Sequence, residues 1–376
     1  MSMDRIEELM QAAYEGPPGS TRTNLVEQAV SVADEMEDGS LGYELRMELI
    51  ESAFFHGQGE RALVAFVWCL SYADRNPDDI DPHGLLWKFK WILGVLPRLP
   101  QISRTKIMEM INDMGRRVDE EGFSQRPVHY MRWKELVTMG DLSAAEPEVE
   151  LWQRAAKDDL QDCPACEADS EVEYLAARHR DEEALKRAKP ILAGKMVCAE
   201  VPHLTLGLIV RPLLRLGRLD EAKEHSDRGY KLTAKNDEFI PAVSEHMLFA
   251  TNTNQLVRGL RMFTRHASWG LETGMPVRRF RFDCAASAFL QKLARAGIPV
   301  ETEPTISKKT GKPRPPARLL LPADHPCHRD DDQYNPAELA AWYRQEAESL
   351  ADQFNRRNGN DYFTRWLNET HELAGV

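Results

Sequence analysis

Apolar residues recur at three- and four-residue spacing along most of the chain, as they do on one face of an α-helix. Ile6, Leu9 and Ala13 follow this spacing in the first segment, and the turn sequence GPPGS at 16–20 ends it. Almost no stretch before residue 298 alternates apolar and polar residues as a half-buried strand does. The pattern therefore predicts an all-α fold.

A helix–turn–helix pattern recurs along this helical part. Its clearest copy spans 203–232, where Gly217 makes the turn and Ala222 lies in the second helix. A small residue at this place lets the two helices of a hairpin approach closely. Weaker copies align on small residues at Ala62, Ala145, Ala184 and Gly259. From Ala145 onward the intervals are 39, 38 and 37 residues, and the first interval of 83 leaves room for one more copy near 101–115.

The turn sequence LGRLDEA at 216–222 resembles that of tetratricopeptide repeats (TPR), whose second helix opens with a similar run of glycine, hydrophobic residue and alanine. The resemblance covers roughly residues 20–297. It implies a right-handed superhelix of helix-turn-helix repeats, with a concave surface that binds peptides or proteins. The period here exceeds the 34 residues usual in that family, so we expect longer helices or wider turns. HEAT-like helix pairing is the alternative architecture.

The character of the sequence changes after Gly297. Residues 298–334 are rich in proline and charge and have no helical period, which predicts a long loop. Asn335 suits a helix cap and Pro336 the first helical turn, so a last helical hairpin is expected at 335–376. The predicted organisation is thus a TPR-like repeat domain at 1–297, the loop at 298–334, and a capping hairpin at 335–376.

Composition limits where the protein acts and what it binds. The 376 residues include 60 acidic and 48 basic ones, a net charge of −12, which makes nucleic acid an unlikely partner. No apolar run is long enough to span a membrane, and the N-terminus lacks the charge and apolar core of a secretory signal. We therefore expect a cytoplasmic protein without a membrane partner, whose six cysteines are thiols or metal ligands.

Three cysteines and one histidine form a candidate zinc site. Cys163 and Cys166 form a C-x-x-C pair after one predicted helix, and Cys198 follows the second helix of the next predicted hairpin. Equivalent turns of neighbouring repeats stack about 10 Å apart, so these cysteines can converge. His203, near the start of the following helix, is the expected fourth ligand, with His179 or a water as alternatives. Three thiolates and an imidazole suit tetrahedral zinc.

The predicted zinc is structural, because four protein ligands leave no open position for catalysis. Its expected role is to hold two repeats together. Two other interpretations stay open. The cysteines can be reduced residues buried at turns between repeats. They can also be a redox pair, although no thioredoxin-like βαβ pattern surrounds them.

A cluster of arginines is the candidate partner-binding surface. A guanidinium group recognises carboxylate or phosphate through paired hydrogen bonds, so the cluster favours a protein or peptide partner of acidic character. The alternative is that these side chains only form ion pairs with acidic neighbours. Three of them share one face of a predicted helix. The cluster consists of Arg258, Arg261, Arg265, Arg278, Arg279 and Arg281.

Residues 325–332 combine two histidines, a cysteine and three aspartates, and they are either a second metal site or a solvated loop. Motifs of serine nucleophiles, phosphate-binding loops, dinucleotide-binding glycines and H-E-x-x-H metal sites do not occur. The favoured function is a non-catalytic scaffold or adaptor that binds a protein or peptide. The alternatives are a metal-dependent enzyme or accessory subunit that uses 325–332, and a peptide-sensing regulator.

Overall fold

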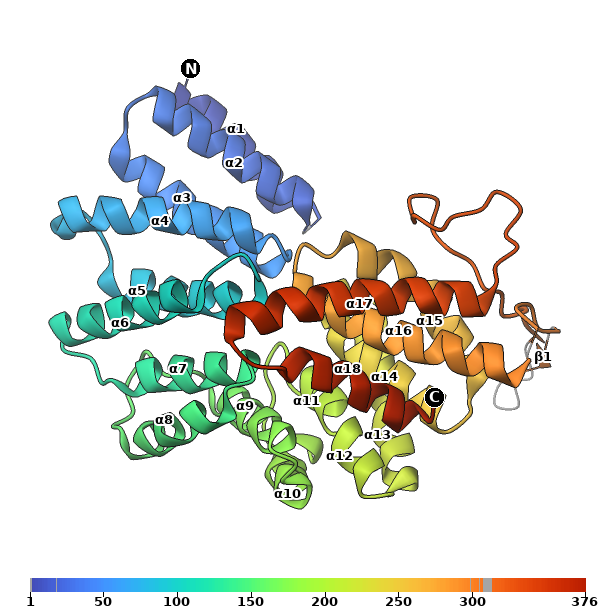
Figure 1. Ribbon diagram of the computed structural model, residues 1–376. Coiled ribbons are helices and arrows are strands. Elements are labelled where there is room, and N and C mark those ends of the chain that lie inside the picture. The colour runs from blue at the N-terminus through green and yellow to red at the C-terminus, as the bar shows by residue number, and fades with distance from the viewer. Residues whose placement is uncertain (1, 18, 298, 304, 307–312) are drawn as a thin grey trace. The chain divides into compact units, whose positions relative to one another are not determined.

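Figure 1 shows a computed structural model in which helices make up most of the chain. The structure describes residues 2–376 except 18, 298, 304 and 307–312. The prediction of a helical fold class is confirmed. Strand structure in the described residues is limited to a two-residue antiparallel pair, β1 (Thr305–Ile306) and β2 (Pro313–Arg314), and to an isolated bridge between Glu301 and Arg318. The predicted loop at 298–334 therefore lies partly outside the described residues.

The chain forms two compact units. Unit 1 comprises residues 1–138 and 143–161, and unit 2 comprises residues 139–142 and 162–376. The helices of unit 1 follow one another with short connections, and each packs on its neighbour in the chain from α1 to α7. They are α1 (Ser2–Glu15), α2 (Ser20–Glu35), α3 (Gly39–Phe55), α4 (Gly59–Arg75), η1 (Pro77–Asp79), α5 (Pro82–Val95), η2 (Leu96–Arg98), α6 (Arg104–Glu120), α7 (Arg126–Thr138) and, after its first residue, α8 (Leu142–Arg154).

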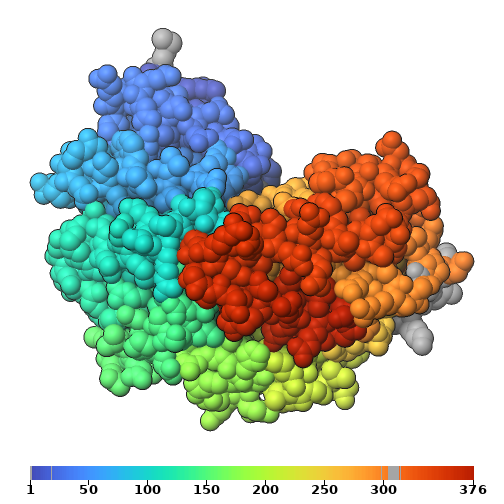
Figure 2. All heavy atoms as spheres, in the orientation of Figure 1, coloured from blue at the N-terminus to red at the C-terminus, as the bar shows by residue number. Residues whose placement is uncertain are grey.

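Unit 2 begins with consecutive helix pairs and ends with two helices that return over them. The last helix, α18, contacts α12, α14 and α16, and α17 packs along α16. The red atoms of α17 and α18 cover one face of this unit in Figure 2. The helices are α9 (Pro164–Ala177), α10 (Asp181–Leu192), α11 (His203–Leu208), α12 (Val210–Arg215), α13 (Leu219–Thr233), η3 (Asp237–Phe239), α14 (Ile240–Asn252), α15 (Leu256–Glu272), α16 (Pro276–Ala296), α17 (Pro336–Asn358) and α18 (Tyr362–Ala374).

The compact units divide the chain at a different place from the domains expected from the sequence. The sequence placed boundaries near 297 and 335, where the helical pattern stops and resumes. In the structure both of these points lie inside unit 2. The reason is that α17 buries Leu339, Ala340 and Tyr343 in the same core as α14, α15 and α16. A break in helical period therefore marks a loop here, not the edge of a compact unit.

Six turns among the described residues share one backbone geometry. In each, a residue with φ between 55° and 78° ends one helix, and the next helix begins two residues later. The positive φ costs a β-carbon-bearing residue about 1–2 kcal/mol, and glycine avoids that cost. Glycine accordingly takes three of the six places. The residues are Glu37, Gly57, Gly140, His179, Gly217 and Asn254.

The hydrogen bonds at these turns are those of a Schellman motif, which satisfies carbonyls at the end of a helix. At Gly217, its N–H donates to the Leu214 carbonyl at 3.1 Å, and the Arg218 N–H donates to the Leu213 carbonyl at 2.9 Å. Ala222 N–H then donates to the Arg218 carbonyl at 3.0 Å and starts the next helix. The same bonds form around Glu37, Gly57, His179 and Asn254.

The fourth residue of each helix that follows such a turn is small and buried. These residues are Gly42, Ala62, Ala145, Ala184, Ala222 and Gly259. Five of them are the positions on which the sequence copies align. Gly42 is an additional copy. The expected copy at 101–115 is helical, as part of α6, but Ser103 caps this helix in place of a left-handed turn. The turn thus recurs, while a TPR superhelix stays a prediction.

Gly259 shows how close the helices come. A β-carbon there would lie 2.5 Å from Cε2 of Phe289 on α16. We expect Gly259→Ala to lower the free energy of unfolding by about 1–3 kcal/mol, because the tightly packed ring has to move. Gly115→Ala is the matched control, since its β-carbon would meet ordinary contacts at 3.4 Å. Alanine should there be neutral or stabilise by up to about 1 kcal/mol. Chemical denaturation measures both, and equal stabilities of the two variants would contradict the close approach.

Candidate functional site

Two of the three candidate cysteine ligands lie at the N-terminus of α9. Cys163 is the N-cap, and its Sγ accepts a hydrogen bond from the Cys166 N–H at 3.4 Å. Pro164 occupies the first helical turn, where its lack of an N–H costs nothing. The Glu167 N–H donates to the Cys163 carbonyl at 3.0 Å and closes the first turn of the helix. The C-x-x-C sequence therefore places two sulfurs on one helix end.

The third cysteine comes from the loop at 193–202, between α10 and α11. The Cys198 N–H donates to the Val201 carbonyl at 3.0 Å, which turns the loop back toward α9. Val201 is buried against Ala165, Ala168 and Ile191. This small apolar cluster holds the loop beside the N-terminus of α9.

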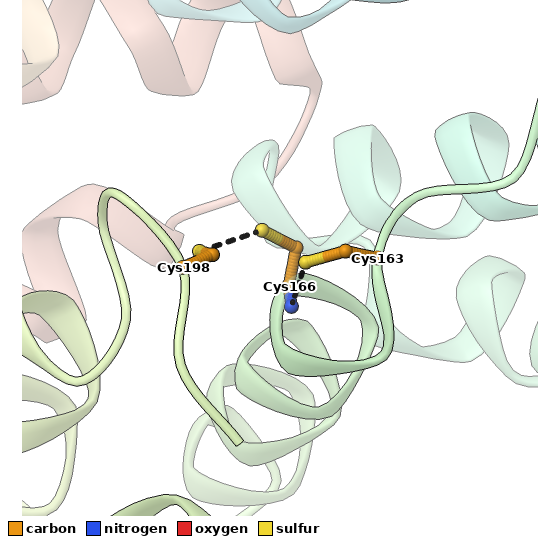
Figure 3. Close-up of side chains that lie close together, drawn as sticks. All are labelled: Cys163, Cys166 and Cys198. Atoms are coloured by element: carbon orange, nitrogen blue, oxygen red, sulfur yellow. Dashed lines mark hydrogen bonds between the residues drawn. The ribbon is translucent and has the colours of Figure 1, made fainter. Parts of the chain in front are cut away.

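The three sulfurs are brought together as the sequence predicts. The Sγ atoms of Cys163, Cys166 and Cys198 all lie within 4.8 Å of one another, and Cys166 and Cys198 are 3.3 Å apart. In Figure 3 the three side chains point toward one another from the helix end and the loop. Tetrahedral zinc with bonds of about 2.3 Å places its sulfurs about 3.8 Å apart. The cluster therefore fits a metal after small side-chain shifts.

The Cys166 and Cys198 sulfurs lie within hydrogen-bonding distance of each other. Burial raises the pKa of the Cys166 thiol, and its contacts with Cys198 and Cys163 raise it further. The Cys166–Cys198 distance is far longer than the 2.05 Å of a disulfide. This contact joins α9 to the loop. The arrangement offers two kinds of chemistry, which are metal binding and thiol oxidation across this contact.

Neither histidine considered as the fourth ligand joins the three cysteines. The His203 ring stacks on Phe239, with ring centroids 4.9 Å apart. Its Nδ1 is buried and has no hydrogen-bond partner among the described residues. His179 is the left-handed residue of the turn between α9 and α10, and its Nε2 lies 3.9 Å from Glu369 of α18. Both rings thus make their contacts with groups outside the cysteine cluster.

The six candidate arginines lie on α15 and α16, and most have partners within unit 2. Arg258 is bound to Asp227, and Arg261 donates to the Pro315 carbonyl at 3.0 Å. Arg265 is exposed, and Arg278 is half-buried. Arg279 pairs with Asp283 and Glu346, and Arg281 pairs with Glu173 at 3.4 Å. Ion pairing inside the protein thus accounts for Arg258, Arg279 and Arg281.

The side chains of the second candidate metal cluster, at 325–332, do not converge as metal ligands do. Both ring nitrogens of His325 are engaged. Its Nε2 is 3.0 Å from the Tyr343 hydroxyl, and its Nδ1 accepts the Cys327 N–H at 2.9 Å. The ring is buried and packs on Trp342. Within the described part of the chain, the ligand atoms of this segment form no cluster of three. His325 therefore anchors the loop to α17.

A buried ion network in unit 2 was not found from the sequence. Arg211 on α12 donates from Nε to the Glu245 carboxylate at 3.0 Å and from Nη1 to Glu369 at 3.1 Å. Arg215 binds the other oxygen of Glu369 at 2.7 Å. Burial alone would raise the pKa of Glu369, but Arg211 and Arg215 lower it below its usual value. No sequence pattern links α12 to a helix more than 150 residues away.

This network lines a cavity of about 360 Å³ between the inner helices of unit 2 and α18. Trp366 lies between two guanidinium groups. The Arg211 Cζ is 3.9 Å and the Arg281 Cζ 4.5 Å from the indole ring centroid. Because Arg211 and Arg215 already have carboxylate partners, the network holds α18 in place rather than offering free cations to a ligand.

Comparison with known proteins does not place the chain in a family. No family model matches the chain, and no curated protein is similar to it in sequence. Among the helices that the structure describes, none has the length and apolarity needed to cross a membrane, in agreement with the sequence prediction.

We expect Cys166→Ser to abolish stoichiometric metal binding, because only two thiolates remain. Wild-type protein purified without chelator should contain about one zinc per chain. With free zinc at 100 times its dissociation constant, zinc should stabilise the wild type by about 2.7 kcal/mol and the variant by almost nothing. Elemental analysis and denaturation with and without zinc measure these effects. Cys327→Ser, at a cysteine outside the cluster, is the control and should bind zinc like the wild type.

Acid should destabilise unit 2 through His325. Burial lowers the pKa of His325 to about 4, from an ordinary value near 6.5. Below about pH 6.5 the unfolded chain therefore binds a proton at His325, whereas the folded chain binds it only near pH 4. Because the unfolded state binds more protons in this range, the free energy of unfolding decreases as the pH falls from 6.5 to 4. In His325→Gln, the slope of unfolding free energy against pH between 6 and 5 should decrease by about 1 kcal/mol per pH unit. An unchanged slope would contradict this role.

Proposed function

We propose that the protein is a non-catalytic helical scaffold that binds a protein or peptide partner, with a structural zinc at Cys163, Cys166 and Cys198. The repeated hairpin carries the proposal. A left-handed turn, a helix start two residues later and a small fourth residue recur at six places. Proteins built from repeated helical hairpins typically have extended surfaces that bind other proteins.

The zinc has a structural role in this proposal. The loop at 193–202 is the longest connection among α9–α13, and the small apolar cluster around Val201 holds only one side of it. A metal bound to Cys198 and to the N-terminus of α9 would fix the other side. Metal binding free energy then adds directly to the stability of the folded loop. Loss of the metal should loosen the loop without unfolding the helices.

The arginines of α15 remain the proposed contact for an acidic partner. Arg265 is exposed, and Arg258 and Arg261 precede it on the same helix. The bond of Arg258 to Asp227 weakens the case, because a partner carboxylate has to compete with it. For this reason the partner's acidic character is a separate part of the proposal from the scaffold itself.

The test is affinity capture from native lysate with three immobilised forms of the protein. These are the wild type, an Arg258/Arg261/Arg265→Ala variant, and an Arg5/Arg154/Arg356→Ala variant. The last removes the same charge from exposed ion pairs elsewhere and controls for non-specific attraction. We expect a stoichiometric protein partner that the wild type and the control retain and the α15 variant loses at least tenfold.

One result would contradict the scaffold itself, and another would contradict only its proposed contact surface. Turnover of a small molecule that co-purifies with the protein, with no protein partner, would favour an enzyme. Equal capture by all three forms would leave a scaffold but exclude the arginines of α15 as its contact surface. Mass spectrometry of the captured proteins and extracted small molecules distinguishes these outcomes.

A further inference from the structure

The cysteine cluster lies at the surface, with its outer side open. Cys163 is exposed, and so are Pro164 and Ala199 beside it. Val197, next to Cys198, exposes 63% of its surface. A pocket of about 760 Å³ opens beside the loop, between Val197, Pro202 and His203 on one side and α13 on the other. On this side the loop is therefore not covered by another part of unit 2.

The inner side of the cluster has no donor to offer. It is formed by Ala165, Ala168, Ile191 and Val201, each at most 3% exposed. Among the described histidine, cysteine and acidic side chains, none besides the three cysteines has a ligand atom within the cluster. The inner side therefore supplies no histidine, cysteine or carboxylate as a fourth ligand, and the exposed outer side is where such a ligand can approach the metal.

His203 is poorly placed to be that ligand. Its ring lies almost parallel to the Phe239 ring, with an angle of 8° between the planes. To reach the sulfurs, it would have to leave this stack at the start of α11. Stacked aromatic pairs contribute about 0.5–1.5 kcal/mol beyond their buried area.

We infer that zinc at Cys163, Cys166 and Cys198 keeps an open fourth position, and that this position binds a neutral imidazole donor from outside the chain. The inference rests on the zinc site proposed above. Three thiolates on Zn²⁺ already give the site a net charge of −1. A further thiolate would make this charge −2, whereas imidazole leaves it unchanged. Imidazole nitrogen is also a ligand that zinc readily accepts.

Such an imidazole has two sources, which are a free small molecule and a histidine side chain of a partner protein. The pocket between the loop and α13 is lined by Val197, next to Cys198, and by none of the three cysteines, so it would take residues that flank a partner's histidine. The metal would in that case take part in partner binding as well as in holding the loop. A three-coordinate protein site with an exchangeable fourth ligand is otherwise typical of catalytic zinc.

The test uses cobalt as a visible reporter of the zinc site. Co²⁺ is added to the metal-free full-length wild type and to His203→Phe, a variant that keeps the aromatic stack but cannot bind metal through residue 203. We expect both proteins to bind one Co²⁺ with the same thiolate-to-metal absorption band. Imidazole should then shift the cobalt spectrum of both in a saturable way, with the same dissociation constant within twofold.

A second arm replaces imidazole by the peptide acetyl-Gly-Gly-His-Gly-Gly-amide, with the alanine peptide as its control. A shift with the histidine peptide alone supports a partner's histidine as the source. A shift with imidazole but with neither peptide supports a small-molecule ligand and excludes a histidine held in a chain.

Three results would overturn the inference, and they differ from one another. A wild-type spectrum that ignores imidazole, while His203→Phe responds, would show that His203 fills the fourth position. Insensitivity of both proteins would show that another group of the chain closes the site. Failure to bind cobalt or zinc at all would overturn the metal site itself, and this inference with it.

Discussion

The architecture depends on a left-handed turn that is short and fully hydrogen-bonded. One residue with positive φ ends a helix, and the next helix begins two residues later. The Schellman bonds satisfy the carbonyls of the first helix inside the turn, so the connection needs no support from the rest of the protein. The small fourth residue then lets the second helix pack closely on its neighbours. Helices joined by this turn pack on each other, as α2 and α3, α3 and α4, and α9 and α10 do.

The cysteine site lies where this constraint is absent. Between α10 and α11 the chain runs through ten residues, at 193–202, instead of a two-residue turn. Hydrogen bonds of Gly194 and Lys195 to the end of α10, the turn at Cys198 and a small apolar cluster hold this segment in the structure. Three sulfurs meet there, from a helix end and from the loop. A metal would supply the fixed connection that the short turn supplies elsewhere, and it would do so at a surface that other molecules can reach.

The sequence was informative wherever the structure is local. Apolar spacing predicted the helices, and the small residues Ala62, Ala145, Ala184, Ala222 and Gly259 marked the second helix of each hairpin correctly. Gly42 is a further small residue in this place, after the left-handed residue Glu37, and the alignment of copies did not include it. The convergence of three cysteines followed from their place after successive helices.

Contacts between distant segments were not predictable in the same way. His203 was assigned to the metal by its spacing, but its ring packs on Phe239, a neighbour that only the tertiary structure supplies. The bonds of Arg211 and Arg215 to Glu369 join helices far apart in the chain, and charge patterns near either end do not reveal them. His325 looked like a ligand in a loop, yet its burial against Tyr343 and Trp342 makes it part of a core.

The most direct test of the account is X-ray absorption at the zinc edge of the protein as purified, without added ligand. The account predicts zinc bound to three sulfur atoms at about 2.3 Å and to one oxygen or nitrogen atom at about 2.0 Å, without the outer-shell scattering of an imidazole ring. A zinc with the scattering of a bound imidazole would place His203 or another histidine of the chain at the site. A protein without zinc would contradict the central claim that these three cysteines hold a metal.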